Sequence, residues 1–231
     1  MNLEMNESIE FKEFSSLDWE RQILLEISRI LNPPFSANQE SDAKFHILLS
    51  GGNTPLPIYR NFQRLNLNWS NFHIWLADER CVDLQDSERS ETMIKKSLGD
   101  PILCQAKFHS PGTGNPTQMA SEYNRQLVAN EKFDLAILGI GEDGHTASLF
   151  PENDLGQNSS SADVLPIYNS PKFPKERISL SLNKINQSNH VLFLVSGNGK
   201  KEIIQKIKAG YVCPATKVQG RYSTKVFYCI Y

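Results

Sequence analysis

Short apolar runs alternate along this chain with longer segments in which apolar residues recur three or four positions apart. Runs such as Phe45–Leu49 and Phe133–Ile140 are typical of buried strands, because a strand covered on both faces needs no polar alternation. Segments such as Lys200–Lys208 have helical periodicity. This alternation predicts an α/β fold: a doubly wound, mostly parallel sheet with helices on both faces.

The same patterns give the expected elements. A first helix follows Ser15 and Ser16, two candidate N-caps, and ends at Asn32-Pro33-Pro34, and a second begins at Pro55. Further helices are expected at Ser87–Leu98, Thr117–Asn130 and Lys200–Lys208. Strands are expected at Ser8–Phe14, Phe45–Leu49, Phe72–Ala77, Phe133–Ile140, Arg177–Leu182, Val191–Val195 and Val226–Tyr231, the last closing the sheet. Gly156–Asp163, rich in Ser and Asn, is expected to be a flexible loop.

Composition limits the classes of partner. The 231 residues, 39% of them hydrophobic, fit one domain over 1–231 with a sizeable core. The net charge is −2 without a basic cluster, which argues against nucleic acid as a partner. No apolar run reaches the roughly 20 residues that span a bilayer, and Met1–Lys12 does not resemble a signal peptide. The four cysteines form no C-x-x-C pair, so we expect a cytoplasmic protein without zinc or disulfides, and no obligate protein partner is evident.

A glycine-rich segment between a strand and a helix is a candidate phosphate site. In Ser50–Pro55, Gly51 and Gly52 allow close backbone approach, while Asn53 and Thr54 supply polar side chains. The following helix start offers free N–H groups and the positive end of its dipole. A plain glycine turn before a capped helix is the competing interpretation.

Two further polar segments follow strands, where ligands bind in such sheets. Asp78-Glu79-Arg80 comes after Phe72–Ala77 and is either a site for a phosphate or polarised carbonyl, or a solvated turn with an internal ion pair. Gly139–His145 matches G-x-G-x-x-G, but Pro151 comes too soon for the long helix of a dinucleotide site. We interpret it as a rigid loop that presents Asp143 and His145.

His145 is the only one of five histidines with an acid two residues away and a glycine frame. A carboxylate can orient an imidazole and raise its basicity, as in catalytic pairs. The alternative is that Asp143 and His145 merely pin the loop. Because the chain has neither a G-x-S-x-G elbow nor an H-E-x-x-H motif, activation of water or proton transfer on a sugar is the expected chemistry.

The chain resembles the 6-phosphogluconolactonases of the pentose phosphate pathway. The most specific match is within Leu138–Pro151 (LGIGEDGHTASLFP), and Leu49–Pro55 (LSGGNTP), Trp75–Val82 (WLADERCV), Ser170–Leu180 (SPKFPKERISL) and Val195–Lys201 (VSGNGKK) also fit. The resemblance implies the fold shared with glucosamine-6-phosphate deaminases and ribose-5-phosphate isomerases. It also implies a hydrolase of a phosphorylated sugar lactone, with no metal and no organic cofactor.

The resemblance also implies roles for single residues. His145 is similar to the family's catalytic histidine, with Asp143 beside it, and Arg80 to its active-site arginine. Lys172, Arg177 and Lys200 resemble phosphate or substrate ligands, which would act with the loop of Gly51, Gly52, Asn53 and Thr54. Asn53 stands where the family pattern has Ser, and Lys217–Tyr231 fits only loosely.

Two other functions compete with lactone hydrolysis. A glucosamine-6-phosphate deaminase would carry Asp-Gly-His-Ile-Ala-Phe-Asn-Glu-Pro, whereas Thr146–Pro151 has no acid at the place of that Glu. A non-catalytic sugar-phosphate sensor would pair the fold with a DNA-binding segment, and the chain has no basic segment or helix-turn-helix at its N-terminus.

Overall fold

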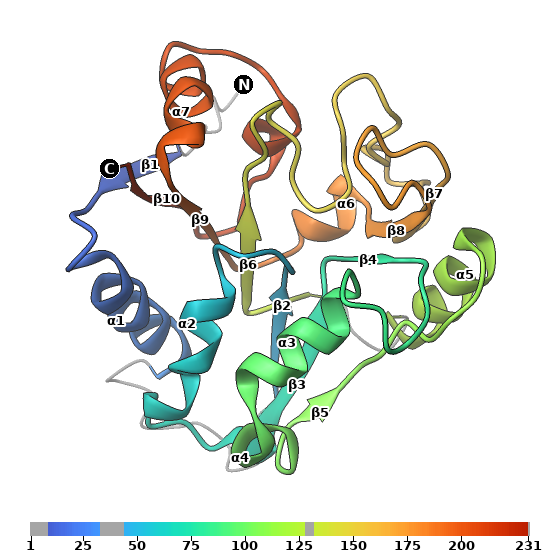
Figure 1. Cartoon of the computed structure of the whole chain (residues 1–231), viewed down its shortest axis with the longest axis horizontal. Helices are drawn as coiled ribbons and strands as arrows, with labels where there is room; N and C mark the ends of the chain where they lie inside the picture. The colour runs from blue at the N-terminus through green and yellow to red at the C-terminus, as the bar shows by residue number, and fades with distance from the viewer. Residues whose placement is uncertain (1–8, 33–43, 128–131, 231) are drawn as a thin grey trace, which may run out of the picture.

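A seven-stranded sheet forms the centre of the computed structural model, which describes residues 9–32, 44–127 and 132–230 (Figure 1). All of its strand pairs are parallel, in the order β1-β10-β9-β6-β2-β3-β5. The strands are β1 (Glu10–Glu13), β2 (Phe45–Leu49), β3 (Phe72–Leu76), β5 (Lys107–Phe108), β6 (Leu135–Gly139), β9 (His190–Ser196) and β10 (Ser223–Cys229). The expected α/β class with a mostly parallel sheet is therefore confirmed.

The apolar runs that predicted strands lie in the middle of this sheet. In β6, Leu135 to Leu138 are fully buried, and β2 and β9 each contribute several more side chains to the core. Burying a large aliphatic side chain contributes about 1.5–3 kcal/mol, so these strands stabilise the sheet on which the functional loops stand.

The C-terminal strand departs from expectation. The sequence predicts that Val226–Tyr231 closes the sheet, but β10 lies inside it, between β1 and β9. Its register pairs Lys225 with Glu10 on one side and with Leu192 on the other. The edge is instead β1, whose short length and charged Glu10 suit an exposed strand.

A second sheet of three antiparallel strands stands beside the first, in the order β4-β8-β7. It corrects two expectations. Asp78-Glu79-Arg80 is strand β4 (Asp78–Arg80) rather than a turn, because its backbone pairs with β8 (Arg177–Leu180). The segment expected as Arg177–Leu182 thus belongs to this small sheet, together with β7 (Val164–Ile167), and not to the parallel one.

The helices agree with the predicted periodicity, with shifted ends. Asp18, not Ser15 or Ser16, occupies the N-cap of the first helix, although Ser15 Oγ hydrogen-bonds to the Asp18 carboxylate at 2.9 Å. The helix expected from Pro55 is only five residues long and continues as a 3-10 turn at Phe62–Arg64. The α-helices are α1 (Trp19–Leu31), α2 (Leu56–Arg60), α3 (Ser90–Leu98), α4 (Asp100–Leu103), α5 (Pro116–Leu127), α6 (Leu182–Ile185) and α7 (Lys201–Lys208).

Several smaller features complete the description. The segment 156–163 contains no helix or strand, as expected for a loop, and residues 128–130 of the expected helix Thr117–Asn130 lie outside the described residues. All four cysteines are free thiols. Within the described ranges, no helix is long and apolar enough to cross a membrane.

Candidate active site

A cavity of about 300 Å³ opens at the carboxyl ends of β2, β3, β6 and β9. Every residue that the sequence singled out lines it except Asp143, which stands directly behind His145. Among the described residues, the lining has four cationic side chains and one carboxylate, Asp78. The lining includes Ser50, Gly51, Gly52, Asn53, Thr54, Asp78, Arg80, Ser90, Gly139, Gly141, His145, Lys172, Phe173, Arg177 and Lys200.

The glycine loop after β2 has two positions that need glycine. Gly52 has φ +98°, a left-handed conformation that L side chains rarely adopt. At Gly51, an added Cβ would lie 2.5 Å from the Oγ of Ser90, at the start of α3. The loop is therefore packed against that helix, and its four residues Gly51 to Thr54 line the cavity.

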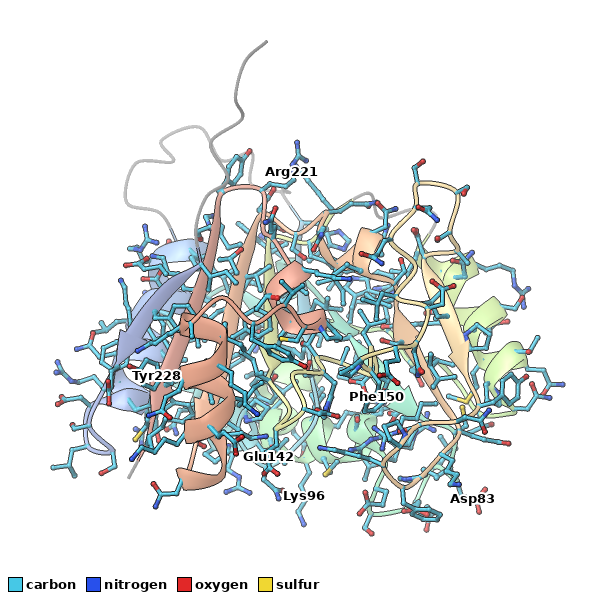
Figure 2. The ribbon with its side chains drawn as sticks, turned by 90° about the horizontal axis from the view of Figure 1, so that it is seen from above. Asp83, Lys96, Glu142, Phe150, Arg221 and Tyr228 are labelled. Carbon is cyan, nitrogen blue, oxygen red and sulfur yellow. The ribbon has the colours of Figure 1, made fainter. Side chains whose placement is uncertain are left out.

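His145 and Asp143 form a hydrogen-bonded pair between the imidazole Nδ1 and the carboxylate Oδ1. The same carboxylate oxygen accepts the backbone N–H of His145 at 3.2 Å, which fixes the carboxylate at two points. The imidazole also packs on the ring of Phe150, with 4.7 Å between the ring centroids. Figure 2 labels Glu142 and Phe150, which precede and follow His145 in this loop. The arrangement leaves Nε2 as the nitrogen available to a ligand.

Two glycines of the same loop are needed for close packing. An added Cβ at Gly141 would lie 2.0 Å from His145 Nδ1 and 2.6 Å from Asp143 Oδ1, so Gly141 makes room for this pair. Gly144 has φ +83°, and a Cβ there would meet Cys213 at 2.6 Å. The second and third glycines of G-x-G-x-x-G therefore allow close packing within the protein, whereas a Cβ at Gly139 would meet nothing within 4 Å.

The environment of the pair favours a neutral imidazole. Burial lowers the pKa of His145 below its ordinary value, although the hydrogen bond to the Asp143 carboxylate acts in the opposite direction. Burial alone would raise the pKa of Asp143, but its hydrogen bonds with His145 and the charge of Lys172 together hold that pKa below the usual range. At neutral pH the pair is thus a carboxylate beside an unprotonated base.

Arg80 is held at the cavity by a buried carboxylate. Glu79, which is fully buried, accepts the backbone N–H groups of Arg80, Ser90 and Glu91, each at 2.7 Å. It therefore joins β4 to the first turn of α3. Burial raises the pKa of Glu79 to about 7 even though these hydrogen bonds favour its charged form. The Arg80 side chain reaches the cavity, and its buried Nε has no hydrogen-bond partner among the described residues.

Arg177 supports the loop that carries Lys172. Its guanidinium donates to the carbonyl oxygens of Pro174 at 2.8 Å, Lys172 at 3.1 Å and Phe173 at 3.2 Å. A fourth, longer contact joins Nη1 to Ser148 Oγ at 3.4 Å. Only 4% exposed, Arg177 thus acts as an anchor for the loop as well as lining the cavity.

Lys200 enters the cavity from the 3-10 turn Asn198–Lys200, which follows β9. Burial lowers its pKa, and the nearby carboxylate of Glu142 partly offsets that effect. The charge of Lys172 lowers the pKa of His145, and the charge of Asp143 raises the pKa of Lys200. Among the described residues, no group of three His, Cys, Asp or Glu side chains is placed to hold a metal ion.

Sequence reasoning missed several residues that line the cavity. Asp78 begins the motif Asp78-Glu79-Arg80, from which only Arg80 was predicted as a site residue. Ser50 begins the glycine segment, yet only the four residues after it were chosen. Ser90 carried no signal, because it begins an ordinary helix, and Phe173 was not selected from Ser170–Leu180, where it is an isolated aromatic in a proline-rich loop.

The fold and the cavity define an α/β protein with a cation-lined cavity at the carboxyl ends of parallel strands, where His145 lines the cavity and Asp143 is paired with it. The family model described as "Glucosamine-6-phosphate isomerases/6-phosphogluconolactonase" matches residues 20–227. The chain belongs to this family.

Individual relatives agree with the family match. The 6-phosphogluconolactonase of Thermotoga maritima is 34% identical over 81% of this chain and 86% of its own length. The human GDH/6PGL endoplasmic bifunctional protein is 33% identical over 80% of this chain, but the chain spans only 25% of that relative. The crystal structure of 6-phosphogluconolactonase from Thermotoga maritima has a TM-score of 0.80 at 28% identity, covering 97% of this chain and 100% of that one.

Proposed function

We propose that the chain hydrolyses 6-phospho-D-glucono-1,5-lactone to 6-phospho-D-gluconate, the second step of the oxidative pentose phosphate pathway. Family membership and relatives that bear the name 6-phosphogluconolactonase support this assignment. The observation that carries it is that His145, paired with Asp143 behind it, lines a cavity whose other charged side chains are mostly cations. A phosphorylated neutral ester needs both parts: cations for the phosphate and a base for water.

Binding of the phosphate is the first task. The loop from Gly51 to Thr54, with Arg177, Lys200 and Lys172, provides backbone N–H groups and positive charge at one cavity. Because the phosphate is remote from the lactone carbonyl, its binding energy positions the reacting carbon rather than changing its chemistry. Arg177 has the least freedom of the three cations, since it also holds its own loop.

His145 is the proposed general base. Its Nδ1 is bound to Asp143, so Nε2 takes a proton from a water molecule that attacks C1 of the lactone. The carbonyl oxygen becomes an oxyanion, which Arg80 or a nearby backbone N–H stabilises. The ring C–O bond then breaks, and His145 returns the proton to the departing ring oxygen. Since the lactone also opens without an enzyme, one base together with positioning is sufficient.

The deaminase alternative has less support. In the loop after His145, Ser148 Oγ donates to Asp78 Oδ2 at 2.7 Å, and no acidic side chain lies between Thr146 and Pro151. Ring opening of an amino sugar by this loop would therefore lack the glutamate that the deaminase pattern supplies. A cytoplasmic location and the absence of an obligate partner stay predictions.

The assignment is tested by following the lactone directly. Glucose-6-phosphate dehydrogenase generates 6-phosphogluconolactone in situ, and its decay is measured with and without the protein once glucose 6-phosphate is exhausted. We expect faster decay that persists in EDTA. Decay at the spontaneous rate would reject the assignment, and ammonia release from glucosamine 6-phosphate at a comparable rate would favour the deaminase.

A further inference from the structure

Two polar side chains of the cavity have no task in the mechanism above. Ser50 follows β2 and Asp78 follows β3, and both line the cavity. The two strands are parallel neighbours, and the pairing continues past their ends, where Ala77 N–H donates to Leu49 O at 2.9 Å. Ser50 and Asp78 therefore follow adjacent strands at the same edge of the sheet, and we call these two lining residues the polar floor of the cavity.

Ser50 has a buried hydroxyl that nothing in the described protein satisfies. The residue is 5% exposed, and its Oγ has no hydrogen-bond partner among the described residues. Its backbone is fixed, since its carbonyl accepts the hydroxyl of Tyr59 at 2.9 Å. A buried polar atom without a partner costs free energy, so such atoms in a ligand cavity indicate a hydrogen bond made to the ligand.

Asp78 has one carboxylate oxygen engaged and one free. Oδ2 accepts the hydroxyl of Ser148 at 2.7 Å, and Ser148, itself fully buried, is contacted in turn by Arg177. No described residue donates to Oδ1. A carboxylate repels a phosphate but accepts strong hydrogen bonds from hydroxyl groups, so Asp78 faces the uncharged part of the ligand.

We propose, on the basis of the lactonase function above, that Ser50 Oγ and Asp78 Oδ1 bind ring hydroxyl groups of the lactone and make the site selective for a polyhydroxylated substrate. The phosphate lies towards the cations, and the ring lies over the floor. A site built to bind a hydroxyl discriminates strongly against an analogue that lacks it, because its own polar groups then stay unpaired. Both residues determine specificity without taking part in proton transfer.

The test compares 6-phosphogluconolactone with three analogues that lack the hydroxyl at C2, C3 or C4. Asp78→Asn keeps an oxygen for Ser148 and replaces the free oxygen by a donor. Ser188→Ala is a matched control for Ser50→Ala, because Ser188 also has a buried hydroxyl without a partner in the described part of the chain but lies outside the cavity lining. Melting temperatures and kcat/KM are measured for every protein.

For the parent lactone we expect kcat/KM to fall about 10- to 100-fold in Asp78→Asn and about 2- to 10-fold in Ser50→Ala, mainly through KM. For at least one deoxy analogue, each variant should match wild type within about twofold, whereas Ser188→Ala should behave as wild type throughout. If kcat/KM falls equally on all four lactones, the two residues only support the fold. That result would overturn this inference but leave the proposed function standing. Absence of hydrolysis by the wild type would overturn the proposed function and this inference with it.

Discussion

At the scale of single residues, the proposed chemistry rests on His145, which presents Nε2 while Asp143 holds Nδ1. We expect His145→Ala to lower kcat by about 10²–10⁴-fold, the usual cost of losing a general base. The melting temperature should fall only slightly, because His145 lies in a loop and packs mainly on Phe150. Steady-state kinetics and thermal unfolding together check this. A folded variant with near-normal kcat would reject the role of base.

The pH profile tests the partnership of His145 with Asp143. A base acts when unprotonated, so activity should fall as pH drops through the pKa of His145, which lies below the ordinary 6.5. The charge of Asp143 raises that pKa, so Asp143→Asn should move the acid limb of kcat/KM to lower pH while also reducing the plateau. The limb is measured by lactone decay at a series of pH values. An unmoved limb would show that Asp143 does not act on His145 electrostatically.

At the scale of elements, two cations of the cavity should respond differently to removal. Lys200→Ala should raise KM by roughly tenfold or more, with a smaller drop in kcat and stability changed by no more than about 0.5 kcal/mol. Arg177→Ala should raise KM similarly and also destabilise the fold by about 2–4 kcal/mol, because buried carbonyl groups of its loop lose their donor. Kinetics and chemical denaturation separate the two effects.

Substrate choice provides the control for these variants. Unphosphorylated gluconolactone should be a poor substrate for the wild type, and both variants should discriminate less against it. Equal rates of the wild type on both lactones would show that these cations do not bind a phosphate.

The loop after β6 gives a paired test of packing. Gly141→Ala should reduce activity at least about 100-fold, because its Cβ would occupy space 2.0 Å from His145 Nδ1. Gly139→Ala, two residues away, adds a Cβ with no heavy atom within 4 Å and should be far milder. Similar losses of activity in both variants would show that the space beside His145 is not the reason for glycine at position 141.

Elements also show what the sequence could and could not predict. Phe45–Leu49 matches β2, since a fully buried strand needs a continuous apolar run. Strand β4 was missed because Asp78, Glu79 and Arg80 are all charged, and their burial depends on partners far away in sequence, such as the first turn of α3. The position of β10 inside the sheet could not be read from periodicity, which reports burial but not the order of strands.

In the site, too, some residues are set by local sequence patterns and others only by packing between distant segments. Residues in motifs, such as His145 and Gly51, could be selected because their type and spacing imply chemistry or close approach. Ser90 could not, because only the packing of α3 against Gly51 brings it to the cavity. The anchoring role of Arg177 was also hidden, since its carbonyl partners are defined by the loop's conformation rather than by side-chain identity.

At the scale of the whole molecule, a histidine cluster away from the cavity should make stability depend on pH. His46 accepts the Trp75 indole N–H at 3.0 Å, and His109 stacks on the same indole. Burial lowers the pKa of both His46 and His109 to about 4. Between pH 6.5 and 4 these two histidines therefore bind more protons in the unfolded chain than in the folded protein, and their contribution to stability should fall as the pH falls.

The variant His46→Gln isolates the contribution of His46 to the pH dependence of stability, because glutamine keeps an acceptor for Trp75 but does not titrate. The variant should lose less stability than wild type between pH 6.5 and 4, by about 1 kcal/mol after allowing for solvent screening. Glu79 acts in the opposite direction, since a carboxyl with a pKa near 7 in the folded protein adds stability as pH falls towards 4.5. Comparing denaturation curves of the two proteins cancels this shared effect, and parallel curves would contradict the prediction.

The place of β10 between β1 and β9 has a consequence for how the chain is made. Strand β1 has β10 as its only strand partner in the described sheet, and the contact between Glu13 and Tyr228 spans 215 positions. A ribosome that synthesises the protein releases β1 well before β10. Strand β1 must therefore wait without its strand partner while the intervening residues are made, whereas β2, β3 and β6 find their neighbours sooner. We expect a nascent chain arrested before Ser223 to expose the open edge of β9, and chaperones that recognise unpaired strand edges to bind it there.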